Sequence, residues 1–140
     1  MRVLFDTNVL IDFLLDRAPH AEVASYLLSQ VERGGIQGLA CANSFTTIFY
    51  LARKAKGVEA ARSYIADLLA LLEVAPVTRT TLEDAVRCTV LDYEDAVVCA
   101  AASQANADCV VTRNEKDFAT APLPVHSPTS LLAALLVTDP

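Results

Sequence analysis

The chain has 140 residues, 54% of them hydrophobic, and a formal net charge of -6. This length and composition predict a single domain over residues 1–137, with a frayed end at 138–140 and a full core that needs no disulfide or structural metal. The acidic balance excludes a protein whose affinity for nucleic acid comes from a broad basic face. It does not exclude a phosphate substrate whose contact is mediated by a divalent cation.

The cysteines and the N-terminus predict a cytoplasmic protein. The four cysteines lack the CxxC or His-flanked spacing of zinc sites, so reduced thiols are expected. Asp6, Asp12 and Asp16 interrupt any apolar core that a signal peptide would need. No near-continuous apolar segment of about 20 residues is present, so no membrane span is expected.

Short apolar runs alternate with helical periodicity along the whole chain. Residues 2–5 predict a strand that ends at Asp6, and residues 7–15 predict the helix after it. Pro19 suits the first turn of a helix that runs to about Glu32. The other predicted strands are 36–42, 73–77, 108–112 and 124–126. The other predicted helices run from Asn43 or Ser44 to Lys56, over 61–72, from Thr78 or Thr80 through Val86, over 93–106, and from Ser127 through Leu136. This alternation predicts an α/β fold with a mostly parallel, roughly five-stranded sheet covered on both faces.

Asp6 is the first polar residue after the first predicted strand. In an open α/β sheet, ligands bind in the crevice outside the carboxyl ends of the strands, so Asp6 lies where chemistry is expected. An Asp at this place is also a common helix N-cap. A single Asp favours the cap, and only further acids at the same edge favour a site.

Two later segments bring further polar residues to the same edge. Asp92, Glu94 and Asp95 stand at the front of an apolar helix, where acids also stabilise the helix dipole and Asp92 can be the N-cap. Asp117 follows the fourth predicted strand, in a segment that also suits an Asx-type turn. Carboxylates that share one crevice raise one another's pKa unless a cation lies between them. Mg²⁺ or Mn²⁺ is the expected cation, and such an ion activates water and stabilises charge on phosphate oxygens.

Three motifs carry a resemblance to a known family: DTNVL at residues 6–10, EDA at 94–96 and TRNEKDF at 112–118. In order and spacing they resemble the PIN domain, in particular the small bacterial toxins of the VapC type. The resemblance implies a three-layer α/β/α sandwich and a Mg²⁺- or Mn²⁺-dependent endoribonuclease. It implies that three acids gather around the metal as catalytic residues: Asp6, Asp95 and Asp117. It also implies polar neighbours that orient these acids or the bound water: Asn8, Thr112 and Asn114.

The same resemblance implies an RNA substrate, a cognate antitoxin that inhibits the enzyme, and a homodimer. Four basic side chains are candidates for steering the phosphate backbone: Arg53, Lys54, Arg113 and Lys116. The simpler interpretation of these residues is solvated charge near helix ends.

One departure from the family pattern bears on catalysis. Family members commonly carry Glu where this chain has Thr47, and often Asp where it has Asn114. Fewer carboxylates weaken cation binding, and Glu94 is a possible replacement. We therefore predict a metal-dependent ribonuclease, the toxin of a type II toxin–antitoxin pair. The alternative is a catalytically degenerate PIN fold that acts as a protein- or RNA-binding module.

Three other α/β functions fit the sequence less well. A phosphoaspartyl enzyme of the haloacid dehalogenase type would carry a second Asp where this chain has Asn8. A response-regulator receiver would need an acidic pair ahead of its phosphoacceptor and a late Lys at a strand end. Dinucleotide binding would need a GxGxxG motif after the first strand.

Overall fold

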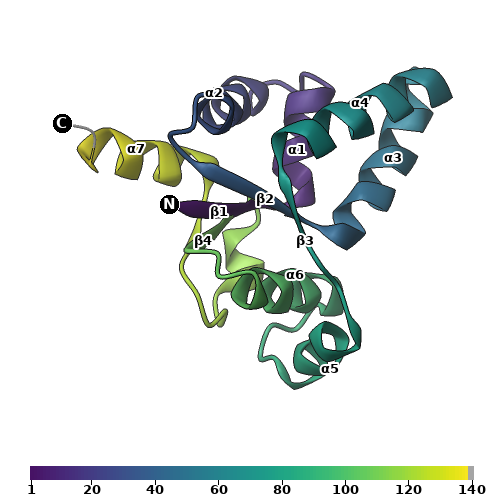
Figure 1. Cartoon of the computed structure of the whole chain (residues 1–140). Coiled ribbons are helices and arrows are strands. Elements are labelled where there is room, and N and C mark those ends of the chain that lie inside the picture. Colours follow the sequence, from purple (N-terminus) through teal and green to yellow (C-terminus); the bar gives the residue numbers. More distant parts are fainter. Residues whose placement is uncertain (139–140) are drawn as a thin grey trace.

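The computed structural model describes residues 1–138 and forms a three-layer α/β/α sandwich (Figure 1). Its five strands are β1 (Arg2–Phe5), β2 (Gln37–Cys41), β3 (Glu73–Ala75), β4 (Cys109–Val111) and β5 (Val125–His126). All neighbouring pairs are parallel, in the order β3-β2-β1-β4-β5. The predicted fold class is confirmed, and β3, which precedes Pro76, lies at an edge as a strand end with proline should. The predicted frayed end at 138–140 concerns Asp139 and Pro140, which lie outside the described residues, and Thr138 is the last residue of a helix.

Five helices cover one face of the sheet and two cover the other (Figure 1). The first face carries α1 (Thr7–Leu14), α2 (Ala21–Glu32), α3 (Ala42–Lys56), α4 (Val58–Leu71) and α7 (Pro128–Thr138). The second carries α5 (Arg79–Arg87) and α6 (Tyr93–Gln104). A short 3-10 helix, η1 (Glu115–Phe118), follows β4. None of the helices within residues 1–138 has the length and hydropathy of a membrane span.

Side chains of the central strands alternate between the two cores. Val3 and Phe5 of β1 pack with the five-helix face, whereas Leu4 between them packs with α5 and α6. This alternation is the period of two that a strand imposes on its side chains. A strand of a parallel sheet that is covered on both faces is therefore apolar at nearly every position, as residues 3–5 are.

Two predicted helix starts are wrong by two residues. Helix α2 begins at Ala21, so Pro19 lies in the turn before the helix and not in its first turn. Helix α3 begins at Ala42 with Cys41 as its N-cap, not with Asn43 or Ser44. The Ser44 hydroxyl instead accepts a hydrogen bond from the Thr7 hydroxyl (2.8 Å). This hydroxyl therefore joins α1 to α3 and does not cap the N-terminus of α3.

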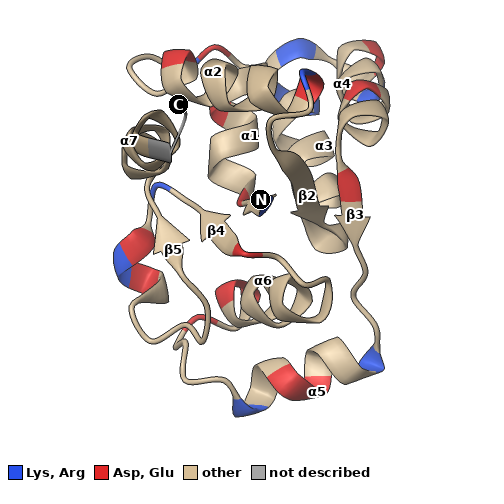
Figure 2. Cartoon of the chain, turned by 60° about the vertical axis from the view of Figure 1, so that its left-hand side comes forward, with Lys and Arg blue, Asp and Glu red and all other residues tan. Residues whose placement is uncertain are grey.

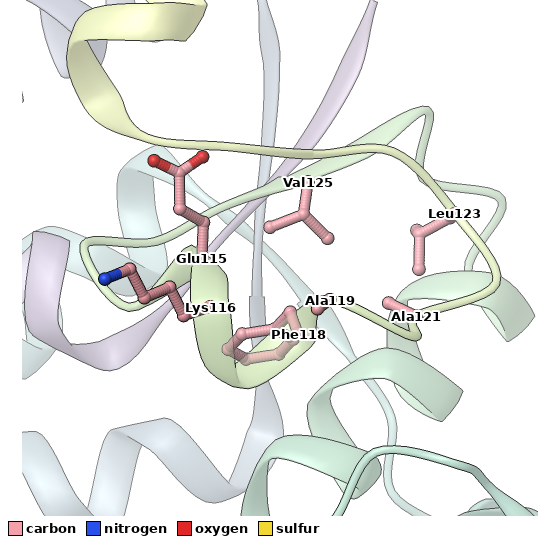
Figure 3. Close-up of a pocket in the computed structure, with 7 residues that line it drawn as sticks. All are labelled: Glu115, Lys116, Phe118, Ala119, Ala121, Leu123 and Val125. Carbon is pink, nitrogen blue, oxygen red and sulfur yellow. The ribbon is translucent and has the colours of Figure 1, made fainter.

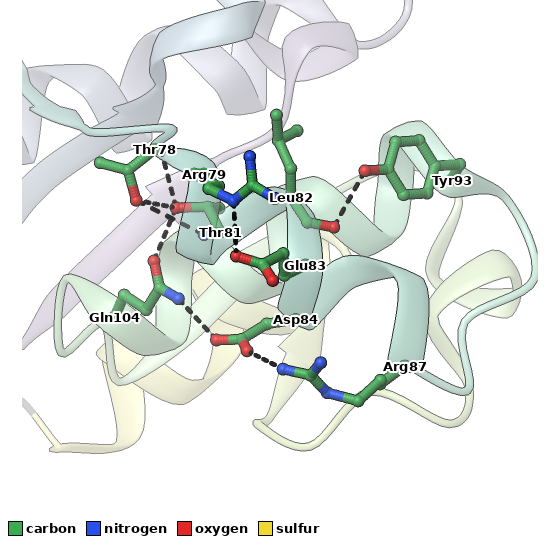
Figure 4. Close-up of polar contacts among 9 residues, drawn as sticks. All are labelled: Thr78, Arg79, Thr81, Leu82, Glu83, Asp84, Arg87, Tyr93 and Gln104. Carbon is green, nitrogen blue, oxygen red and sulfur yellow. Dashed lines mark hydrogen bonds and ion pairs between the residues drawn. The ribbon is translucent and has the colours of Figure 1, made fainter.

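A polar network fixes α5 against α6, the helix that carries the second group of acids (Figure 4). The buried Thr81 hydroxyl donates to Gln104 Oε1 (2.7 Å), and Gln104 Nε2 donates to Asp84 Oδ2 (2.7 Å). The Tyr93 hydroxyl donates to the Leu82 carbonyl (3.0 Å) at the other end of α6. Both ends of α6 are thereby tied to α5, which fixes the N-terminal turn that carries the acids.

Candidate active site

The site is built on the carboxyl edge of the two central strands, β1 and β4. Asp6 follows β1 and Thr112 follows β4, and the Asp6 N–H donates to the Val111 carbonyl (2.9 Å). The Thr112 hydroxyl donates to Asp6 Oδ2 (2.8 Å), and the Thr7 N–H donates to Asp6 Oδ1 (2.8 Å). Asp6 is therefore the N-cap of α1, as the capping interpretation expects, and it also lies at the carboxyl edge of the sheet, where the other interpretation expects a site.

Asp6 is only 7% exposed. Burial raises its pKa above the usual range, while the hydrogen bonds from Thr112 and Thr7 oppose that rise by stabilising the carboxylate. A buried carboxylate that accepts from two donors and forms no ion pair with any of the described residues is oriented but electrostatically costly.

Asn8 and Asn114 complete the polar contacts around Thr112. Asn8 Nδ2 donates to Thr112 Oγ1 (3.2 Å), and Asn8 Oδ1 accepts from the Arg113 N–H (3.2 Å). The Asn114 N–H also donates to Thr112 Oγ1 (3.1 Å). The predicted polar neighbours Asn8, Thr112 and Asn114 thus form one network with Asp6, although Asn114 contributes its backbone and not its side chain.

The sequence analysis missed a buried ion pair behind this network. Asp12 is 1% exposed, and the Arg113 guanidinium donates to both of its oxygens, from Nε to Oδ2 and from Nη2 to Oδ1 (3.2 Å). Asp12 lies four residues after Asn8, so both side chains point from the same face of α1. This spacing could have indicated that Asp12 belongs to the site, but its partner Arg113 lies 101 positions away in the sequence.

The second half of the site is the N-terminal turn of α6. Asp92 is the N-cap and its Oδ1 accepts from the Asp95 N–H (3.0 Å). Burial raises the pKa of Asp95 to about 7, with further contributions from the negative charges of Asp6, Asp92, Asp117 and Glu94. Asp6, Asp117 and Glu94 therefore each lie close enough to Asp95 to raise its pKa.

Asp117 approaches from η1, whose Phe118 is 2% exposed and anchors the segment in the core. Asp117 itself is exposed, and its N–H donates to the Asn114 carbonyl (2.9 Å). Thr47 is half-buried on α3, one turn after Ser44, whose hydroxyl contacts Thr7 next to Asp6. All the predicted acidic and polar site residues thus lie on elements that start at one edge of the sheet.

The predicted basic residues lie in three different places. Figure 2 shows that the Lys and Arg residues as a whole are spread over several elements of the chain. Arg53 and Lys54 stand over the exposed Tyr50 ring, with Arg53 Cζ and Lys54 Nζ at 5.9 and 5.4 Å from its centroid. They lie at the C-terminal end of α3, about 14 to 15 Å along the helix from Ser44 at about 1.5 Å per residue. Lys116 lies on η1 beside Asp117, and Arg113 is held by Asp12.

Cavities flank η1 on both sides. One, of about 370 Å³, is lined by η1 and the segment that leads into β5, including Phe118 and Val125 (Figure 3). The other, of about 310 Å³, lies between η1 and the loop before α6 and includes Asp92 and Asp117 in its lining. The second cavity adjoins the acids directly.

The residues of the site fit a hard divalent cation in an open arrangement. Within residues 1–138, no group of three His, Cys, Asp or Glu side chains lies close enough to enclose a metal ion. Mg²⁺ needs no such enclosure, because it is usually held by one or two carboxylates with waters in the remaining positions. Burial and then four neighbouring negative charges raise the pKa of Asp95, a bound cation would oppose that rise, and carboxylate oxygens are the donors that a hard cation prefers. Asp6, Asp95 and Asp117 are the side chains that would hold it.

Comparisons with solved structures agree with this fold. A toxin–antitoxin complex from Klebsiella pneumoniae is 28% identical, with a TM-score of 0.69 over 90% of this chain and 97% of that one. VapBC2 from Rickettsia felis, bound to a promoter DNA fragment, is 18% identical, with a TM-score of 0.71 over 91% and 98%. VapC20 from Mycobacterium tuberculosis, a toxin that cleaves the sarcin-ricin loop, is 15% identical, with a TM-score of 0.63 over 77% and 86%.

A sequence search among curated proteins finds no significant match. The family model described as PIN domain matches residues 2–116, which include β1, the acids of α6 and the start of η1. The order of strands, the acids at their carboxyl edge and this match lead to one conclusion: the chain belongs to the PIN domain family.

Proposed function

We propose that this protein is a metal-dependent endoribonuclease that hydrolyses RNA phosphodiester bonds and is the toxin of a type II toxin–antitoxin pair. The observation that carries the proposal is the convergence of negative charge on Asp95 from Asp6, Asp92, Glu94 and Asp117. Four like charges around a half-buried carboxylate are a costly arrangement for a purely structural region, and perturbed pKa values concentrate at functional sites.

Each residue has a separate role in the proposal. Asp6, Asp95 and Asp117 hold Mg²⁺ or Mn²⁺, and Glu94 adds negative charge where Thr47 carries none. When bound, the cation supplies the positive charge that activates water and stabilises a phosphate oxygen. Thr112 orients the Asp6 carboxylate by donating a hydrogen bond to it, and Asn8 orients Thr112 by donating to its hydroxyl oxygen.

The four basic residues have three different roles in the proposal. Lys116, next to Asp117, contacts the phosphate backbone beside the reacting group. Arg53 and Lys54, stacked on Tyr50, steer RNA from the α3 end. The Arg113 guanidinium is engaged with Asp12, so we assign its charge to the support of the site and not to steering.

The proposed partners follow from the solved structures that the chain resembles. The complexes from Klebsiella pneumoniae and Rickettsia felis contain toxin and antitoxin, and VapC20 cleaves an RNA loop. We propose the same kinds of partner here, an RNA substrate and a cognate antitoxin, with a homodimer as the active form and the cytoplasm as the place of action.

A second candidate function rests on two neutral residues. Thr47 and Asn114 occupy positions that are often acidic in the family, and residues 1–138 contain no enclosed three-ligand metal cluster. The chain would then be a degenerate PIN fold that binds RNA or protein without cleaving it.

Cleavage of RNA by purified protein in Mg²⁺ or Mn²⁺ distinguishes the two functions. We expect the wild-type chain to cleave, and Asp6→Asn and Asp95→Asn to lose at least about 100-fold in rate, since each removes a carboxylate from the cation site. Asp67→Asn, on the exposed surface of α4, is the matched control and should keep full activity. Circular dichroism checks that the variants fold. Cleavage that survives undiminished in both site variants would contradict the proposal.

A further inference from the structure

The cavity of about 310 Å³ beside the acids has two walls. The loop before α6 forms one wall, with Leu91 and Asp92, and η1 forms the other, with Lys116 and Asp117. Asp117 is also one of the three acids of the candidate active site. A molecule in the cavity therefore lies directly beside the group that reacts there.

Both walls are anchored in the core. Val90, next to Leu91, is 4% exposed, and Phe118, next to Asp117, is 2% exposed, and both belong to the core under α5 and α6. The Thr89 hydroxyl donates to the Thr120 carbonyl (3.1 Å), which ties the loop to the segment after η1. The cavity is therefore preformed, as ligand sites usually are.

Three chemically different groups face this cavity. Leu91 is 100% exposed, which leaves an apolar side chain without cover next to charged residues. Asp92 Oδ1 caps α6, whereas its Oδ2 has no hydrogen bond from any of the described residues. Lys116 is exposed and forms no ion pair within residues 1–138. The cavity thus offers an apolar surface, a free acceptor and a positive charge.

We propose that this cavity binds the nucleobase of a nucleotide next to the scissile phosphate and prefers cytosine to uracil. Leu91 packs against the face of the base, Asp92 Oδ2 accepts a hydrogen bond from the exocyclic amino group, and Lys116 pairs with the flanking phosphate. A carboxylate that accepts from the cytosine N4 amino group is a known mode of base discrimination. Uracil presents a carbonyl oxygen at that position, which a carboxylate repels.

This subsite rests on the proposed function, because it assumes an RNA substrate. An arginine-bearing peptide would also satisfy Asp92 and Asp117, but it would leave Lys116 unpaired next to another cation. A nucleotide engages the apolar side chain, the acceptor and the lysine together, whereas the peptide would engage only the two acids, and we therefore favour the nucleotide.

Titration of the full-length wild-type protein with cytidine 5′-monophosphate and with uridine 5′-monophosphate, followed by NMR, tests the proposal. Neither probe contains a phosphodiester bond that the enzyme could cleave. We expect the Leu91 methyl and Lys116 amide signals to shift with the cytidine nucleotide, and the uridine nucleotide to bind about fivefold to tenfold more weakly.

Two variants separate the base contacts from the fold. Asp92→Ser keeps an N-cap side chain for α6 but removes the carboxylate, and should bring the two nucleotides to equal affinity. Leu91→Ser should weaken both about threefold to tenfold. Val86→Ser on α5, 73% exposed and outside this cavity, is the control and should bind as wild type does.

The outcomes distinguish the subsite from the proposed function. RNA cleavage without any shift at Leu91, or a cytidine preference that survives Asp92→Ser, overturns the subsite and leaves the nuclease standing. Shifts at Leu91 with the predicted preference support the pocket even if RNA is not cleaved, in which case it is the nuclease that fails. An arginine peptide that shifts the Leu91 signals while neither nucleotide does would also overturn the proposal.

Discussion

The two halves of the candidate active site are held in opposite ways. Asp6, on the β1–β4 side, accepts hydrogen bonds on both oxygens and is almost fully buried. Asp95, on the α6 side, is half-buried, four other acids raise its pKa, and it forms no ion pair with any Lys or Arg of the described residues. The first half is preorganised by the protein alone, whereas the second half needs a positive charge from outside. This difference is what we expect of a site whose protein part orients a cation that the chain does not supply.

The largest expected effect concerns the support of the preorganised half. Arg113→Gln removes the bidentate partner of the buried Asp12 carboxylate and leaves it the longer contact with Arg17 Nη1 (4.0 Å), which should lower the free energy of unfolding by about 3 kcal/mol. Urea denaturation measures the loss. Arg87→Gln removes an exposed pair with Asp84 on α5 and should cost under about 1 kcal/mol. Equal losses in the two variants would show that the Asp12 pair is no more than surface charge.

A smaller effect is expected from the hydroxyl that joins Asp6 to Asn8. Thr112→Val keeps the shape of the side chain but removes the donor to Asp6 Oδ2 and the acceptor from Asn8, at a cost of about 1 to 3 kcal/mol. Thr46→Val, an exposed position on α3, is the control and should change stability by under about 0.5 kcal/mol. Equal losses of stability in the two variants would show that the Thr112 hydroxyl does not stabilise the Asp6 carboxylate.

The smallest effect is a gain in stability that depends on pH. The folded pKa of Asp95 is about 7, well above the ordinary 3.8, so the folded state holds this proton more tightly than the unfolded state does. The charge of Asp95 therefore destabilises the fold progressively as pH rises from about 4 to 7, and fully above 7. In EDTA, Asp95→Asn should raise Tm by roughly 3 °C at pH 8 and by nothing measurable near pH 3.5.

Thermal melts at several pH values check this prediction, with Asp67→Asn as the control for loss of one negative charge. The control should show no gain that grows with pH. A lower Tm for Asp95→Asn at pH 8 would mean that Asp95 has a stabilising partner and that the second half of the site is not short of positive charge.

The sequence predicted the strands and helices well because they depend on local patterns. Residues 2–5 and 108–112 show the apolar runs of buried parallel strands, and the polar residues that follow mark the carboxyl edge. That Asp6 and Asp95 approach each other follows from the topology, which the alternation of strands and helices restricts. The predicted fold is confirmed.

What the sequence did not reveal depends on contacts between distant segments. The pairing of Asp12 with Arg113 joins α1 to the loop after β4, and no local pattern marks either residue as a partner of the other. Ser44 has the side chain of an N-cap, but Thr7 takes its hydroxyl, and α3 begins two residues earlier. The cavity beside Leu91 likewise forms only when the loop before α6 and η1 are both anchored in the core.

Titration of Mn²⁺ into EDTA-stripped protein by isothermal calorimetry tests the central claim most directly. We predict that the wild-type chain binds Mn²⁺ and that Asp6→Asn loses this binding while it remains folded, because the acids of both halves converge on one cation. Absence of binding at millimolar Mn²⁺, or equal binding by wild type and Asp6→Asn, would contradict the account and favour a PIN fold that works only as a binding module.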